Sequence, residues 1–202
     1  MNIYTETNFI LELAFQQEQA SHCEAILVAC ESGEHNLIIP AYCLAEPHEK
    51  LYRQTRDRRE LQRTLVSELR QLARSGTYTE RIGKIQDIAD LLIQSSEEDM
   101  QRFDAYRSRL LRISDVISLT NKILLSAATY EKSYDLTPQD ALVYASVVAH
   151  LSAEISQQSC FLNRNSRDFD TPEIVNELAG YNCRTIPRFD DGERYIHSSS
   201  VA

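Results

Sequence analysis

The stretch LIIPAYCLAE, residues 37–46, decides the fold. It begins with a continuous apolar run, Leu37-Ile38-Ile39, which ends at Pro40. Such a run is typical of a central parallel strand that is buried on both faces. The residues after Pro40 predict a helix that carries Glu46. The stretch is therefore interpreted as a buried strand followed directly by a helix.

The same alternation of strand and helix continues on both sides of this stretch. Strands are predicted at Ile3–Thr5, Leu37–Ile39, Val116–Ile117, Cys160–Leu162 and Asn182–Ile186. Helices are predicted at Asn8–Gln19, His22–Glu31 and Asn121–Lys132, and further helices begin at Thr137-Pro138 and Thr171-Pro172. Thr7 or Asn8 is expected to cap the first helix. We predict an α/β protein: a three-layer α/β/α fold with a central parallel sheet of four or five strands.

A long helical segment interrupts this alternation. Residues 51–112 lack strand signals and carry apolar stripes at helical spacing, with a break at Ser75-Gly76-Thr77. The acidic cluster Glu97-Glu98-Asp99 suits a helix N-terminus, where carboxylates complement the helix dipole. We predict a helical insertion, about 51–112, within a single domain that spans 1–187. The polar tail 188–202 is expected to be disordered.

The composition limits the class of protein. Apolar content of 43% and charged content of 25% are those of a soluble globular protein. No apolar run approaches the roughly 20 residues of a membrane helix, and the start lacks a secretory signal, so we expect a cytoplasmic protein without a membrane partner. The five scattered cysteines and five histidines show no metal-ligand spacing. Any metal would therefore be held by oxygen.

One helical region is basic within an acidic chain. The net charge is −9, yet Lys50 to Arg63 holds six basic residues, and Arg70, Arg74 and Arg81 follow. Such a segment can bind a phosphate backbone. The alternative is a solvated helix face whose arginines pair with Asp57, Glu60 and Glu68.

Four acids stand where predicted strands pass into helices: Glu6, Glu46, Asp140 and Asp168. The carboxyl ends of parallel strands share one edge of the sheet, where ligands collect, so these carboxylates are candidates for a metal site. At any single position another interpretation is open. Asp140 follows Thr137 by three residues and can close a capping box, and Asp168 lies in a segment that reads as a polar turn.

Taken together, these motifs resemble the PIN domain family of metal-dependent ribonucleases. The resemblance rests on Glu6-Thr7-Asn8, on Glu46 in its helix, on Pro138-Gln139-Asp140-Ala141, and on Asn163-x-Asn165-x-x-Asp168-Phe169. It covers residues 1–50 and 113–187 and implies a parallel sheet with Mg²⁺ or Mn²⁺ at its carboxyl edge. Glu6 stands where the family usually has Asp, and Asn165 where an acid is common. Many members are toxins neutralised by a partner antitoxin.

The expected function is that of a metal-dependent endoribonuclease that hydrolyses RNA phosphodiester bonds, in the manner of a toxin of a toxin–antitoxin pair. Mg²⁺ and Mn²⁺ prefer oxygen ligands and keep several waters, so a few carboxylates suffice. Glu6, Asp140 and Asp168 are predicted to bind the metal, Glu46 to orient water or hold a second ion, and Asn165 to act as a polar helper. RNA contacts are predicted for Arg56, Arg59, Arg164 and Arg167.

Two alternatives remain at this level. The first is a PIN fold that no longer cleaves and serves as a protein or RNA binding module, with the insertion as a dimer or partner surface. A homodimer and an antitoxin are both compatible with the chain. The second is a generic α/β domain in which the four acids are only caps and solvated charges.

Overall fold

The structure, a computed structural model, describes residues 1–154 and 157–199. Within these ranges the side chains of 79–81, 83–86, 166, 167 and 199 are not described. Residues 200–202, the last part of the predicted tail, lie outside the described residues.

A five-stranded parallel sheet forms the centre of the described chain. Its strands are β1 (Asn2–Thr5), β2 (Asn36–Pro40), β3 (Asp115–Ile117), β4 (Ser159–Leu162) and β5 (Cys183–Ile186). They lie in the order β3-β2-β1-β4-β5, and every neighbouring pair is parallel. Tyr4 is in register with Ile38 on one side and with Phe161 on the other. The chain order reverses at β1, so the sheet has a topological switch point there.

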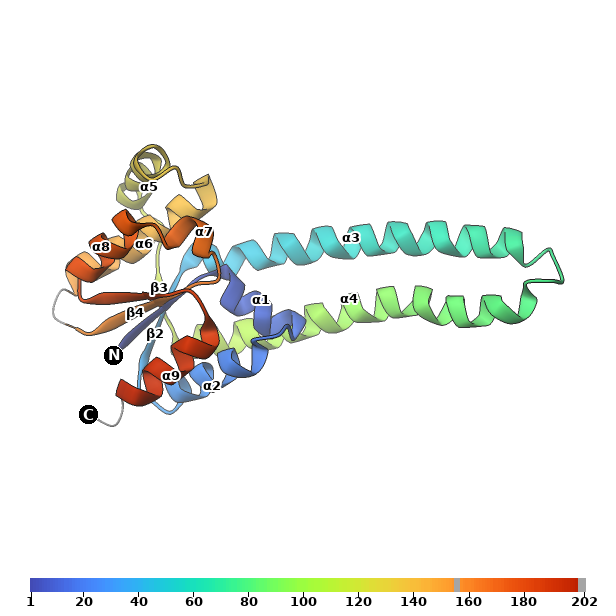
Figure 1. Ribbon diagram of the computed structural model, residues 1–202, viewed down its shortest axis with the longest axis horizontal. Coiled ribbons are helices and arrows are strands. Elements are labelled where there is room, and N and C mark those ends of the chain that lie inside the picture. Colours follow the sequence, from blue (N-terminus) through green and yellow to red (C-terminus); the bar gives the residue numbers. More distant parts are fainter. Residues whose placement is uncertain (155–156, 200–202) are drawn as a thin grey trace.

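Helices cover both faces of the sheet and confirm the predicted three-layer α/β/α fold. In Figure 1, α5, α6 and α8 lie on one side of the sheet, and α1, α2 and α9 lie on the other. The helices are α1 (Thr7–Phe15), α2 (Ala20–Glu31), α3 (Ala41–Leu72), α4 (Thr79–Ile113), α5 (Asn121–Ser133), α6 (Pro138–Ala153), α7 (Ser166–Phe169), α8 (Pro172–Gly180) and α9 (Phe189–Ser199).

The central strands lie in the core with both faces buried, which explains why their sequences are so apolar. Ile3, Ile39 and Phe161 are fully buried because helices pack on both faces of their strands. The five cysteines, Cys23, Cys30, Cys43, Cys160 and Cys183, are also buried and carry free thiols. They act as small apolar core residues, as the sequence predicted.

Helices α3 and α4 form an arm that projects from the sheet, as Figure 1 shows. The predicted break at Ser75-Gly76-Thr77 is confirmed, since α3 ends at Leu72 and α4 begins at Thr79. The acidic cluster is placed differently from the prediction: it lies inside α4, where Asp99 accepts from Arg58 of α3 at 2.8 Å. A partly buried ion pair between the helices, joined by Arg102 of α4, accounts for this acid, and not the helix dipole. No helix among the described residues has the length and apolarity needed to cross a membrane.

The prediction of a disordered tail was wrong for residues 189–199, which form α9. Phe189 and Ile196 are buried, and their seven-residue spacing places both on one face of the helix. Phe189 also makes an edge-to-face contact with Phe9, with ring centroids 5.4 Å apart. Two apolar residues among many polar ones did not stand out in the sequence, yet they bury one face completely.

The substitution Ile196→Ala tests this packing. We expect it to lower the free energy of unfolding by about 2 kcal/mol, because it removes a buried side chain at a chain end that can partly relax. The measurement is urea denaturation followed by circular dichroism. Ser198→Ala is the matched control on the exposed side of the same helix. An Ile196→Ala protein as stable as the wild type would contradict the packing.

Candidate active site at the carboxyl edge of the sheet

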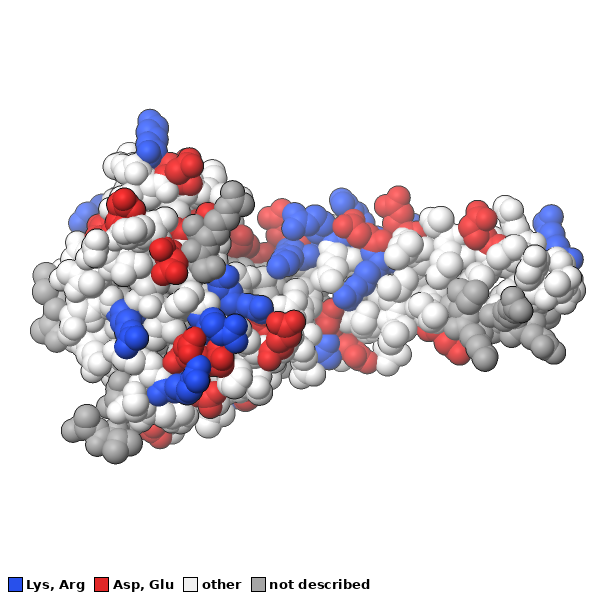
Figure 2. All heavy atoms as spheres, in the orientation of Figure 1, with Lys and Arg blue, Asp and Glu red and all other residues white. Residues whose placement is uncertain are grey.

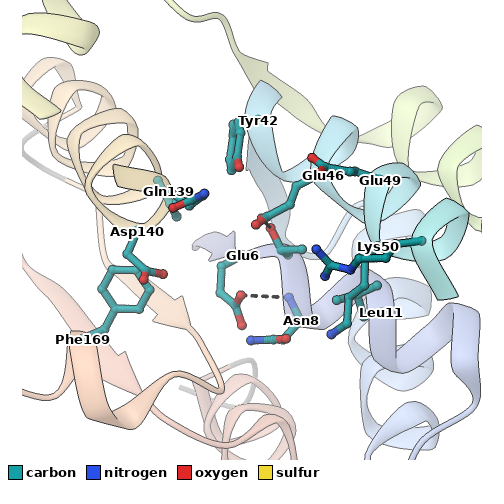
Figure 3. Close-up of a pocket in the computed structure, with 13 residues that line it drawn as sticks. Glu6, Asn8, Leu11, Tyr42, Glu46, Glu49, Lys50, Gln139, Asp140 and Phe169 are labelled. Atoms are coloured by element: carbon teal, nitrogen blue, oxygen red, sulfur yellow. Dashed lines mark hydrogen bonds between the residues drawn. The ribbon is translucent and has the colours of Figure 1, made fainter. Parts of the chain in front are cut away.

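Three of the four predicted acids line one cavity of about 280 Å³. Glu6 follows β1, Glu46 lies in the helix that follows β2, and Asp140 lies in the first turn of α6. Figure 3 shows their side chains approaching the same space from three different elements. The cavity is lined by Glu6, Thr7, Asn8, Leu11, Tyr42, Glu46, Glu49, Lys50, Arg53, Gln139, Asp140, Val143 and Phe169. It lies beside the switch point, where the sequence placed the site.

Glu6 is the N-cap of α1, so the prediction of Thr7 or Asn8 as the cap was wrong. Its carboxylate accepts from the backbone N–H of Asn8 at 2.8 Å and of Arg164 at 3.0 Å. Only 5% of the residue is exposed. Burial raises the pKa of Glu6 to about 7, and the charge of Asp140 adds to the shift. Glu6 therefore joins β1 to the loop after β4 and keeps a carboxyl group that exchanges its proton near neutral pH.

Asp140 combines a capping role with a place in the cavity. Thr137 caps α6, and its hydroxyl donates to Asp140 Oδ2 at 2.5 Å. Asn165 Nδ2 donates to the other oxygen, Oδ1, at 3.2 Å. Thr137 is thus the N-cap that the sequence predicted, and Asp140 supports it through the hydroxyl contact. This role does not exclude function, because Asp140 also lines the cavity. Asn165 lies beside Asp140 as a polar neighbour that orients its carboxylate.

Glu46 is held by Thr7, whose hydroxyl donates to Glu46 Oε2. This contact links α3 to the start of α1. One and two turns further along α3, Lys50 and Arg53 also line the cavity and face the acids. Neither Lys50 nor Arg53 was predicted to belong to the site, although Lys50 stands four residues after Glu46, on the same face of the helix.

Asp168 is placed differently from the other acids. It lies in the short helix α7, where its N–H donates to the carbonyl of Asn165 at 3.1 Å. Its side chain is not among the described groups that line the cavity; the neighbouring Phe169 is. The side chain of Arg167, predicted to contact RNA, lies outside the described residues.

The other predicted RNA contacts lie away from the acids. The guanidinium of Arg164 pairs with the buried carboxylate of Glu12 and lies 3.4 Å from Glu18. A buried carboxylate left without its partner is costly, so the guanidinium of Arg164 is engaged by Glu12. Arg56 and Arg59 line a second cavity, of about 500 Å³, on the arm.

The donor set fits a hard divalent cation. Among the described side chains, no three carboxylates, imidazoles or thiols lie close enough to share one ion. Mg²⁺, however, keeps several waters and needs only one or two carboxylates. At the ends of β1 and β4, Thr5 Oγ1 and both polar atoms of the Asn163 side chain are buried without a hydrogen-bond partner in the described part of the chain. Such groups are usually satisfied by water or an ion. Neither residue lines the cavity, so the fit rests on Glu6 and Asp140, which suit an ion that is held partly through water.

The carboxylates lie at the switch point of a parallel α/β sheet, which is where ligands bind in folds of this class. The PIN domain family, whose members are generally nucleases, matches residues 3–169, and the chain belongs to this family. PIN domain nucleases typically use divalent metals. Comparison with curated proteins and with solved structures found no match.

Proposed function

We propose that this protein is a metal-dependent endoribonuclease. The observation that carries the proposal is the approach of Glu6, Glu46 and Asp140, from three separate elements, to one cavity at the carboxyl edge of the sheet. Membership of a family of nucleases supports it at a coarser level. If these three acids were only helix caps or surface charges of a generic α/β domain, their convergence on one cavity would be a coincidence.

Each residue has a role in this proposal. Glu6 and Asp140 hold Mg²⁺ or Mn²⁺, with Asp168 contributing through water. The bound ion supplies polarisation of the phosphoryl group and a lowered pKa for an attacking water. Glu46, fixed by Thr7, orients that water. Asn165 fixes the Asp140 carboxylate.

The basic side of the cavity completes the proposed site. Lys50 and Arg53 line it from α3, the helix that also carries Glu46, and are suited to bind the phosphates next to the scissile bond. They replace Arg164 in this role, because its guanidinium already neutralises Glu12.

The direct test is cleavage of a mixed pool of cellular RNA by the purified protein with Mn²⁺, Mg²⁺ or chelator. The proposal expects cleavage with either metal and none with chelator. RNA that stays intact with both metals, or is cleaved equally in chelator, would overturn it. Gel analysis of end-labelled RNA distinguishes internal cleavage from trimming at the ends.

Metal binding is expected to stabilise the fold. Because an ion that binds only the folded state stabilises it by mass action, Mn²⁺ at ten times its Kd should add about 1.4 kcal/mol to the free energy of unfolding. Differential scanning fluorimetry with increasing Mn²⁺ measures this as a rise in Tm. The Asp140→Asn protein should respond less at every concentration, whereas Asp115→Asn, a carboxylate on the edge strand β3, should respond as the wild type does.

The second candidate is a PIN fold that binds RNA or protein without cleaving it. Two observations favour it: no three described metal-binding side chains cluster, and Asn165, where an acid is common, donates to Asp140. This function expects RNA binding that persists in chelator and no cleavage with metal.

A further inference from the structure

A row of arginines leads from the acidic cavity out along the arm. Arg53 lines that cavity. Arg56, Arg59 and Arg63 line the second cavity, of about 500 Å³, which lies between α3 and Met100 of α4. Successive members are three or four residues apart, which makes each the neighbour of the next on the helix surface. Figure 2 shows Lys and Arg side chains, with Asp and Glu side chains between them, over the half of the arm nearest the sheet.

These arginines are not neutralised in the way that an ordinary solvated helix face would be. Of the acids expected to pair with them, only Asp57 forms an ion pair, with Arg56 at 3.2 Å, and both partners are exposed. Among the described residues, Arg53, Arg59 and Arg63 form no ion pair. Glu60 lines the same cavity as three of the arginines and leaves it with a positive balance.

An exposed aromatic ring stands at the start of the row. Tyr52 is 66% exposed and lines the second cavity with Arg56 and Arg59. A tyrosine ring beside arginines that track a backbone is the combination that binds single-stranded nucleic acid, because each base offers a face for stacking. In a duplex the bases are stacked on each other and are not accessible to such a ring.

We propose that this row, Arg53-Arg56-Arg59-Arg63 with Tyr52, is a binding track for single-stranded RNA that leads into the cleavage cavity. The inference rests on the proposed function and specifies its substrate class. From Arg53 to Arg63 the helix rises about 15 Å, so the track holds several nucleotides on one side of the scissile phosphate. Phosphates contact the guanidinium groups, and one unstacked base lies on Tyr52.

Binding is measured separately from cleavage, on the Asp140→Asn background. The probe is a fluorescein-labelled oligouridylate octamer, read by fluorescence anisotropy. Arg59→Glu with Arg63→Glu should weaken binding at least tenfold and lower the salt slope of log K by about 1.4, because two phosphate contacts are lost. Tyr52→Ala should weaken binding by about tenfold.

The matched control is Arg70→Glu with Arg74→Glu. It makes the same change in charge closer to the tip of the arm, starting about 10 Å beyond Arg63 and outside the proposed track, so affinity should change by less than about twofold under screening salt. Equal losses in both double variants would show a general field effect and overturn the track. Unchanged affinity in the protein with Arg59→Glu and Arg63→Glu would also overturn the track. The arginines would then be suited to an acidic protein partner instead. Tighter binding of a duplex of the same length would contradict the single-strand specificity.

The outcomes for the track and for the nuclease are distinguishable. Wild-type protein that binds the octamer through Arg59 and Arg63 but never cleaves RNA supports the track and contradicts hydrolysis. Protein that cleaves RNA equally well with and without the Arg59→Glu and Arg63→Glu changes contradicts the track and leaves hydrolysis in place.

Discussion

Replacing Asp140 with Asn is expected to reduce RNA cleavage by on the order of 10²–10³-fold, the usual effect of removing one charged group that acts on a transition state. The carboxylate lines the cavity with Glu6 and Glu46, and the amide keeps its shape but not its charge. The loss should appear in the rate at saturating Mn²⁺. Recovery at high metal would indicate that Asp140 contributes only to the affinity for the ion.

Folding should survive this substitution. An Asn side chain can still accept from the Thr137 hydroxyl, and loss of a charge in the first turn of a helix costs about 1 kcal/mol or less. Glu173→Gln is the matched control, because Glu173 stands in the first turn of α8 behind Thr171 and Pro172 but outside the cavity. Full activity in Asp140→Asn, or an equal loss in Glu173→Gln, would rule out the assignment.

The metal-free protein is expected to lose stability as pH rises toward neutrality, because of Glu6. Burial raises the pKa of this carboxyl from 4.5 to about 7 in the folded state. Below pH 4.5 the group is protonated in both states and has no effect. Between these values only the folded state holds the proton, and above about pH 7 the folded state must bury a charge. The total loss is roughly 3 kcal/mol.

Urea denaturation in chelator at pH 5 and pH 8 measures this change. In Glu6→Gln the contribution of residue 6 to the pH dependence should vanish. A pH-independent loss remains, because Asn8 and Arg164 donate to different oxygens of Glu6 and the amide replaces one of these oxygens with an NH2 group. The difference in the free energy of unfolding between pH 5 and pH 8 therefore isolates the effect of the Glu6 charge. Glu49→Gln, an exposed carboxylate of the same cavity, should retain the wild-type pH dependence. A Glu6→Gln protein with an unchanged pH dependence would contradict the buried charge.

The regular elements of the fold were predictable because their signals are local. The apolar run Leu37-Ile38-Ile39 became β2, and threonine followed by proline marked the starts of α6 and α8. The errors came where a signal was weak or ambiguous. Helix α9 depends on the burial of Phe189 and Ile196, and an acid such as Asp99 suits a helix start as well as the interhelical pair that it forms with Arg58.

The candidate site was predictable in part. The order of strands and helices was enough to bring Glu6 and Glu46 to one edge of the sheet, since all parallel strands end there. Asp140 begins α6, which follows the helix α5, so its place in the same cavity depends on how α6 packs. The positions of Asp168 and Arg164 were not predictable in this way. Arg164 follows a strand like the acids do, but its side chain turns to Glu12, a contact made across 152 positions of the chain.

The sequence by itself determined the strand and helix pattern, the family and the edge at which the acids gather, because periodicity, capping and chain order depend on neighbouring residues. Only the tertiary structure decided which charges are already satisfied. Burial raises the pKa of Glu6. Arg164 forms an ion pair with Glu12, and Arg58 forms one with Asp99. Arg59 and Arg63, in contrast, have no ion-pair partner among the described residues. Desolvation and pairing depend on distances between segments remote in the chain, and these distances exist only once the sheet and the arm have formed.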